Sequence, residues 1–377
     1  MMLDTLRDNP EVVWGFALAL LIVLLLTPGV GRFARILGVV DEPGDTRRLH
    51  VRPVPRLGGI ALLLGIFVPA LAFLPLDGPY RGIMLGAAVA TTVGAIDDFR
   101  GMPWWGKLAG QVAAGGIAIG FGVNVDRFTF PGFGSQELPD WFSGPATLVW
   151  IVAIMNMVNF LDGMDGLAAG ICAIAGTTFA VIGLSLGAAD AALLAAIVAG
   201  ACFGFLHHNF YPARIFMGDS GALLLGFLLA TLAVEGLVKT AALATLVLPL
   251  IVLAIPIIDT SFVFAKRLKY RQPLYEADRM HLHHRFMNIG FSQARAVSYM
   301  YFWCALLAAA ALATRFLPPR PHGDWDGSNL IVAAVIAVGA LAASVYIAYL
   351  LEIVKLANPR IRRREEQARR EAQRRSA

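Results

Sequence analysis

The sequence predicts an all-α integral membrane protein with many transmembrane helices. Hydrophobic residues make up 58% of the 377-residue chain and charged residues only 15%, and the mean hydropathy is +0.67. Apolar stretches of roughly 18 or more residues, enough to cross about 30 Å of hydrocarbon, recur along its length. Together these features indicate a chain that crosses a membrane several times.

Eleven apolar segments are predicted to form the transmembrane helices. The first is too long for the apolar region of a signal peptide, and no small-residue cleavage pattern follows it, so we expect it to be retained. Residues 123–143, between the fourth and fifth segments, contain DRFTFPGFGS and are compatible with a short hairpin. The eleven segments are approximately 12–30, 57–75, 82–96, 107–122, 145–161, 167–186, 190–206, 221–236, 240–264, 295–314 and 329–353.

The distribution of basic residues predicts the orientation of the chain. If the N-terminus lies outside, 25 of the 31 lysines and arginines fall in cytoplasmic segments. Because the cytoplasmic loops of membrane proteins carry an excess of Lys and Arg, we predict that the N-terminus lies outside and the C-terminus in the cytoplasm.

The net positive charge of the chain comes from its last residues. From Lys355 onward there are 9 basic and 3 acidic residues, which leaves 22 basic and 23 acidic residues elsewhere. This tail has no interleaved aromatic residues, so it does not indicate nucleic-acid binding. It is typical of a solvated helical extension or of an anchor to anionic lipid headgroups. We therefore divide the chain into a transmembrane domain, 1–354, and a basic cytoplasmic tail, 355–377.

Three motifs place carboxylates where apolar segments meet the predicted cytoplasmic face. AIDDFRG (95–101) ends the third segment, NFLDGMDG (159–166) ends the fifth, and FMGDSG (216–221) opens the eighth. Taken singly, they are also compatible with a solvated helix end, a turn and an N-cap. Ionisable side chains at membrane depth are costly and normally line a polar cavity, so their coincidence predicts a functional site.

Carboxylate oxygens without cysteine favour a hard metal ion at this site. Magnesium, with manganese as the alternative, commonly bridges one or two carboxylates and the phosphates of a substrate. Asp162 and Asp165 share one face if helical, and Gly163 and Gly166 let backbone approach a ligand closely. These features favour a nucleotide diphosphate as substrate. The cysteines lie inside apolar segments without paired spacing and are expected to be buried thiols with no role: Cys172, Cys202 and Cys304.

A fourth motif, DRMHLHHRFMNIGFS (278–292), lies in the most basic internal loop. His281, His283 and His284 are candidate zinc ligands, but no fourth ligand stands at a suitable spacing and no cysteine accompanies them. Beside Arg279 and Arg285, these histidines better suit the binding of phosphate oxygens. A role in structuring the loop also stays open.

These motifs, in this order, resemble the polyprenyl-phosphate N-acetylhexosamine-1-phosphate transferases, a family that includes the enzymes initiating enterobacterial antigen, teichoic acid and peptidoglycan. The resemblance covers the chain from about residue 12 to 353. It implies an eleven-helix fold whose cytoplasmic loops transfer sugar 1-phosphate from a UDP-sugar to a lipid phosphate, with release of UMP. The matching stretches are HVRPVPRLGG (50–59), IDDFRGMPWWGKLAGQ (96–111), NMVNFLDGMDGLAAG (156–170), HNFYPARIFMGDSGALLLG (208–226) and DRMHLHHRFMNIGF (278–291).

The resemblance implies roles for the residues that would act on phosphate. Asp219 matches the magnesium ligand of the family, and Lys107 matches a lysine lining the phosphate site. Asp97 and Asp98 match paired aspartates assigned to activation of the lipid phosphate or to metal contact. Three histidines match a motif near the diphosphate and sugar: His281, His283 and His284.

The resemblance also implies a nucleotide site. Asn159, Asp162 and Asp165 match the nucleotide-side motif, with Asp162 in a catalytic role, and Asn209 and Phe216 match positions that hold and stack the uracil.

One loop predicts the branch of the family. Residues 53–59 read PVPRLGG, like the branch that uses UDP-N-acetylglucosamine, whereas the peptidoglycan branch has a Lys-x-Gly-Thr-Pro-Thr-Met-Gly-Gly loop. The lysine of that loop is missing here, so Arg52 or Arg56 is expected to replace it. A phospho-MurNAc-pentapeptide transferase is the alternative.

The resemblance therefore implies a multi-pass protein of the bacterial inner membrane with its active site on the cytoplasmic face. It would use undecaprenyl or another polyprenyl phosphate in the first membrane step of an envelope polysaccharide, such as lipopolysaccharide O-antigen or teichoic acid. The family also implies a homodimer. A secondary transporter is disfavoured because its sites usually lie near the midplane, and a non-enzymatic scaffold would not need these motifs.

Overall fold

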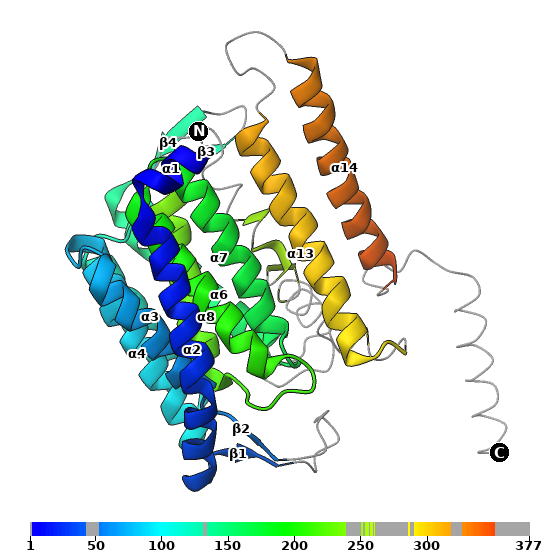
Figure 1. Ribbon diagram of the computed structural model, residues 1–377. Coiled ribbons are helices and arrows are strands. Elements are labelled where there is room, and N and C mark those ends of the chain that lie inside the picture. Colours follow the sequence, from blue (N-terminus) through cyan, green and yellow to red (C-terminus); the bar gives the residue numbers. More distant parts are fainter. Residues whose placement is uncertain are drawn as a thin grey trace, which may run out of the picture.

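The computed structural model is a bundle of long helices that run side by side (Figure 1). Most of the predicted segment 240–264 and the whole tail, 355–377, lie outside the described residues. The structure describes residues 2–42, 53–130, 134–238, 290–317 and 326–350, together with 250–251, 253–255, 257–258, 260 and 286.

Each of the other ten predicted segments contains a described helix. In the described part of the chain, eight helices are long and apolar enough to cross a membrane. A polytopic, mainly helical membrane protein is thus confirmed, whereas eleven spans and their orientation stay predictions. The helices are α1 (Met2–Asp8), α2 (Pro10–Ile36), α3 (Gly58–Phe73), α4 (Gly78–Arg100), α5 (Trp104–Gly120), α6 (Asp140–Leu161), α7 (Leu167–Ser185), α8 (Ala189–Asn209), α9 (Gly218–Leu232), the π-helix η1 (Ala233–Val238), α13 (Gln293–Phe316) and α14 (Gly327–Leu350).

Two short antiparallel strand pairs connect the helices. The pair β3 (Arg127–Phe130) and β4 (Gly134–Glu137) forms the hairpin with which the sequence is compatible. The sequence did not indicate the pair β1 (Val40–Asp41) and β2 (Val54–Pro55), in which Val40 lies opposite Pro55. The carbonyl of Pro55 also accepts a hydrogen bond from the backbone N–H of Phe216, 2.8 Å away. This bond ties the chain before α3 to the chain before α9.

Helices α7, α8 and α9 form the interior of the bundle, and most of their residues are buried. Helices α13 and α14 lie side by side at one edge (Figure 1, yellow and orange), where α14 is mostly exposed. Exposed side chains such as Val149 and Val335 are apolar, as expected where helices face lipid. The expectation of buried cysteines is confirmed for Cys172, Cys202 and Cys304.

Glycines let α9 approach its neighbours closely. A Cβ at Gly94 of α4 would collide with backbone atoms of Asp219 and Ser220, and one at Gly226 of α9 would lie 2.7 Å from the Cα of Met155. Small residues at such contacts are typical of membrane helices, where association depends on close packing. The glycine at position 94 therefore allows the end of α4 to touch the start of α9.

We expect Gly94→Ala to lower the free energy of unfolding by about 1 to 3 kcal/mol, because the added methyl overpacks the contact between α4 and α9. Gly116→Ala in α5 is the matched control, since no atom lies within 4 Å of a Cβ added there and Ala favours a helix more than Gly does. Thermal unfolding in detergent compares the two. Equal midpoints would contradict the close packing of α4 on α9.

Candidate active site

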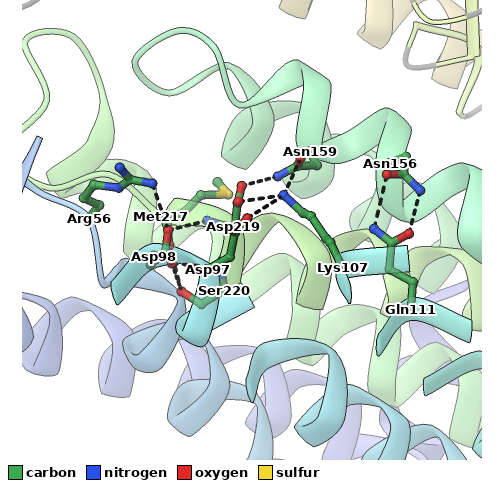
Figure 2. Close-up of polar contacts among 10 residues, drawn as sticks. All are labelled: Arg56, Asp97, Asp98, Lys107, Gln111, Asn156, Asn159, Met217, Asp219 and Ser220. Carbon is green, nitrogen blue, oxygen red and sulfur yellow. Dashed lines mark hydrogen bonds and ion pairs between the residues drawn. The ribbon is translucent and has the colours of Figure 1, made fainter. Parts of the chain in front are cut away.

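Four helix ends bring together polar side chains at one end of the bundle. The last turn of α4 carries Asp97 and Asp98, and the first turn of α5 carries Lys107. The last turn of α6 carries Asn159, and the first turn of α9 carries Asp219. Figure 2 shows these side chains turned toward one another. We call these five residues the polar cluster.

Lys107 is the central cation of the polar cluster. Its Nζ donates to Asp219 Oδ2 at 2.6 Å, to Asp97 Oδ2 at 3.1 Å and to Asn159 Oδ1 at 3.3 Å. The lysine thus links α4, α5, α6 and α9. Its side chain and those of Asp97 and Asp219 remain partly exposed, so a ligand can reach the charged atoms.

Both oxygens of Asp219 have partners within the polar cluster. Asn159 Nδ2 donates to Oδ1 at 2.6 Å, while Lys107 holds Oδ2. A metal ion or phosphate that enters here must therefore share Asp219 and Lys107 or separate them. The same two groups offer an anionic and a cationic partner to one bound ligand.

Asp98 holds the N-terminus of α9. Its carboxylate accepts hydrogen bonds from Asp219 N at 2.9 Å and from Ser220 N and Oγ at 3.0 and 2.8 Å. Arg56 Nη2 donates to it at 3.4 Å, and the Asp98 side chain is 0% exposed. A carboxylate at this position satisfies otherwise unpaired N–H groups and complements the helix dipole. With its oxygens so occupied and shielded, Asp98 is poorly placed for the metal or substrate contact predicted from the sequence.

Asp162 follows α6 beside the polar cluster. Its carboxylate has no hydrogen-bond or ion-pair partner among the residues that the structure describes. The surrounding protein displaces water and raises the pKa of this carboxyl well above its usual value, and the negative charges of Asp219 and Asp98 raise it further. A cation bound nearby would favour the charged form of Asp162.

Asp165 and Asn209, both predicted to contact the nucleotide, tie two loops together. Asp165 Oδ2 accepts from the backbone N–H of Ala213 at 2.8 Å. Asn209 accepts from Gly166 N at 3.1 Å and donates to the Ile215 carbonyl at 2.8 Å, and only 2% of it is exposed. These bonds use the polar atoms of Asn209 and fix the loop before α9, so the structure argues against direct uracil contact by this residue.

The same loop carries the predicted uracil-stacking residue. Phe216 is partly exposed, and its backbone pairs with Pro55 O and Gly58 N at 2.8 and 3.0 Å. Arg56, between them, bonds Asp98 and lies 3.9 Å from Asp41. The structure therefore brings the 53–59 loop to the start of α9. Five predicted site residues lie outside the described residues: Arg52, Arg279, His281, His283 and His284.

The polar cluster can hold a magnesium ion only if a substrate supplies further ligands. Within the described ranges, no three His, Cys, Asp or Glu side chains form a group that could hold a metal. The partly exposed oxygens of Asp219 and Asp97 offer two carboxylate ligands. Magnesium commonly takes one or two carboxylates and completes its shell with water and substrate phosphates.

Comparison with known proteins identifies the same region of the chain. The family described as Glycosyl transferase family 4 matches residues 80–237, a stretch that contains the whole polar cluster. The chain is 35% identical over 310 residues to a Bacillus subtilis (strain 168) protein named probable undecaprenyl-phosphate N-acetylglucosaminyl 1-phosphate transferase. That match covers 81% of this chain and 85% of the relative.

Two further relatives represent different named activities. A Mycobacterium leprae (strain TN) decaprenyl-phosphate N-acetylglucosaminephosphotransferase is 34% identical over 85% of this chain and 88% of its own. A Moorella thermoacetica phospho-N-acetylmuramoyl-pentapeptide-transferase is 31% identical over 81% of this chain and 98% of its own.

The geometry predicts unequal effects of replacing two adjacent aspartates. Without any substrate, Asp98→Asn should lower the free energy of unfolding by about 1 to 3 kcal/mol, because it removes a buried charged acceptor from the N-terminus of α9. Asp97→Asn is the matched control and should cost less, since Asp97 is partly exposed and faces the like-charged Asp219 as well as Lys107. Thermal unfolding in detergent measures both. A larger loss for Asp97→Asn would refute the anchoring role of Asp98.

Proposed function

Because the chain belongs to glycosyl transferase family 4, we propose that it transfers N-acetylglucosamine 1-phosphate from UDP-N-acetylglucosamine to a polyprenyl phosphate and releases UMP. The observation that carries this proposal is the polar cluster, in which Lys107 lies between Asp219 and Asp97 at one end of a helical bundle. A site at a membrane face can meet a soluble nucleotide and a lipid headgroup together. The greater identity to the N-acetylglucosaminyl relatives than to the muramoyl-pentapeptide relative supports the choice of sugar.

The reaction is a phosphoryl transfer, in which positioning and charge neutralisation dominate. An oxygen of the lipid phosphate attacks the β-phosphorus of the UDP-sugar. The bond from that phosphorus to the bridging oxygen breaks, and the oxygen leaves with UMP. Lys107 is placed to bind phosphate oxygens once they draw it from Asp219, which places a positive charge where negative charge accumulates.

A magnesium ion is part of this proposal. Asp219 and Asp97 would hold it with the substrate phosphates, and it would neutralise the diphosphate and the leaving UMP. Asp162 lies beside these carboxylates, and a cation bound there would favour its charged form, which would then add to the negative charge that holds the ion.

Asp97 need not act as a general base. A phosphate monoester has a second pKa of about 6, so most of the acceptor is already a dianion at pH 7. We therefore propose that Asp97 positions Lys107 and the metal rather than accepting a proton. A two-step reaction through an aspartyl phosphate is the competing mechanism, and isotope exchange between UMP and UDP-sugar without lipid would support it.

We also propose that this end of the bundle faces the cytoplasm of a bacterium, where UDP-sugars are made. The excess of Lys and Arg in the segments that the sequence predicts to be cytoplasmic supports that orientation. The muramoyl-pentapeptide reaction is the alternative function, since it shares the acceptor and the chemistry of the polar cluster.

The test is release of UMP by purified protein given UDP-N-acetylglucosamine, undecaprenyl phosphate and Mg²⁺. We expect turnover that requires all three, with UDP-MurNAc-pentapeptide as the competing donor. In the same assay, Asp219→Asn should lower kcat at least about a hundredfold, roughly 2.7 kcal/mol in the barrier, because it removes a metal-binding charge. Near-wild-type turnover of this variant at saturating Mg²⁺ would remove Asp219 from the site, and turnover of the pentapeptide donor alone would favour the alternative function.

A pH profile separates the two roles of Asp97. If the acceptor ionises by itself, the low activity of Asp97→Asn should rise between about pH 6 and 7.5, following the second ionisation of the lipid phosphate. If Asp97 is an essential base, the variant should stay at background throughout. The second result, in a variant that still binds the UDP-sugar and remains folded, would restore Asp97 as the base.

A further inference from the structure

A second polar contact joins α5 and α6 one turn below the polar cluster. Gln111 Nε2 donates to Asn156 Oδ1 at 3.2 Å, and Asn156 Nδ2 donates back to Gln111 Oε1 at 2.8 Å (Figure 2). Asn156 Nδ2 also donates to the Val152 carbonyl of its own helix at 2.8 Å. Gln111 is only 1% exposed and Asn156 is partly buried, so the Gln111 side of this amide pair lies inside the bundle.

The amide pair and the polar cluster form two successive contacts between antiparallel helices. Lys107 and Gln111 lie four residues apart on α5, and Asn159 and Asn156 lie three apart on α6, so each helix presents both residues on one face. The first contact, between Lys107 and Asn159, spans 3.3 Å. The contact between α5 and α6 continues one turn further along α5 at Gly115, where an added Cβ would lie 2.7 Å from a methyl group of Leu148.

Burial makes the amide pair specific for one register of the two helices. Among the described residues, Asn156 is the hydrogen-bond partner of both polar atoms of Gln111. Sliding α5 by one residue would shift it by about 1.5 Å and leave the buried amide of Gln111 without its described partner, which is costly away from water. Leucine or alanine contacts at the same place would tolerate such a shift more easily.

Catalysis would weaken the first contact, because substrate phosphates compete with Asp219 and Asn159 for Lys107. The amide pair touches none of the groups that would bind substrate, so it persists when Lys107 turns to the phosphates. Resting on the proposed function, we propose that the Gln111–Asn156 pair is a positioning element that keeps α5 and α6 in the register at which Lys107 and Asn159 both reach Asp219.

Three variants test this role. Gln111→Met and Asn156→Leu keep side-chain volume, but the first leaves Asn156 Oδ1 and the second leaves the buried Gln111 amide without their described partner, so both should lose thermal stability and turnover. The double variant Gln111→Met/Asn156→Leu removes both amides, and replacing both partners by apolar groups can be nearly neutral for stability. We expect the double variant to regain stability while its kcat, normalised to the folded fraction, stays about tenfold below wild type. Its KM for UDP-N-acetylglucosamine should remain within about twofold, because loss of positioning affects kcat more than binding.

The exchange variant Gln111→Asn/Asn156→Gln keeps one long and one short amide and should restore most of kcat. Thr92→Val is the control, since the Thr92 hydroxyl bonds only the Ala88 carbonyl of its own helix among the described residues, and its kcat should match wild type. A folded double variant with wild-type kcat would show that the amides only satisfy each other, and would overturn the proposal.

A substrate-free measurement keeps this test independent of the proposed reaction. Lys107 is held between carboxylates, so an amine-reactive reagent should label it slowly, as measured by mass spectrometry. Loss of register in the double variant should raise the labelling rate several-fold. An unchanged rate would contradict the positioning role, whereas failure of UMP release in the wild type with faster labelling in the variant would refute only the proposed function.

Discussion

The carboxylate of Asp98 accepts hydrogen bonds from the first turn of α9, and the geometry of the site depends on that contact. It is possible because Gly94 has no side chain to separate the two helices. Gly59 of α3 also lies against this turn, and its N–H donates to Met217 O at 2.8 Å. The start of α9 is therefore held by both α4 and α3. These contacts also fix the position of Asp219, the first acidic residue of that helix.

Adjacent aspartates acquire different partners because successive residues point about 100° apart on a helix of 3.6 residues per turn. Asp98 turns toward α9 and is shielded from solvent, whereas Asp97 turns toward Lys107 and stays partly exposed. A helix end can thus supply one structural and one accessible carboxylate from two neighbouring positions. Burial separates these roles, since the desolvated carboxylate requires several donors and the exposed one can exchange its partner.

Loops at this end of the bundle are fixed by hydrogen bonds as well as by buried apolar side chains such as Ile215 and Leu57. Asn209 and Asp165 connect the turn after α6 to the loop before α9, and the 53–59 loop pairs with that same loop through Pro55. Such bonds suit a region that must remain open to a polar substrate, because apolar side chains packed over the site would exclude that substrate. The interior of the bundle, with α7, α8 and α9 mostly buried, supplies the rigid support beneath.

The sequence by itself determined the class of the protein and the places of its described helices, and it predicted where the site lies, because long apolar runs and clustered carboxylates are local patterns that need no contact map. Only the tertiary structure decided which carboxylate is buried and which stays accessible. Asp97 and Asp98 are indistinguishable in the motif, and only the position of α9 buries one of them. Gln111 and Asn156 lie 45 residues apart, so their pairing depends on how α5 and α6 pack, a long-range arrangement that neither helix encodes separately.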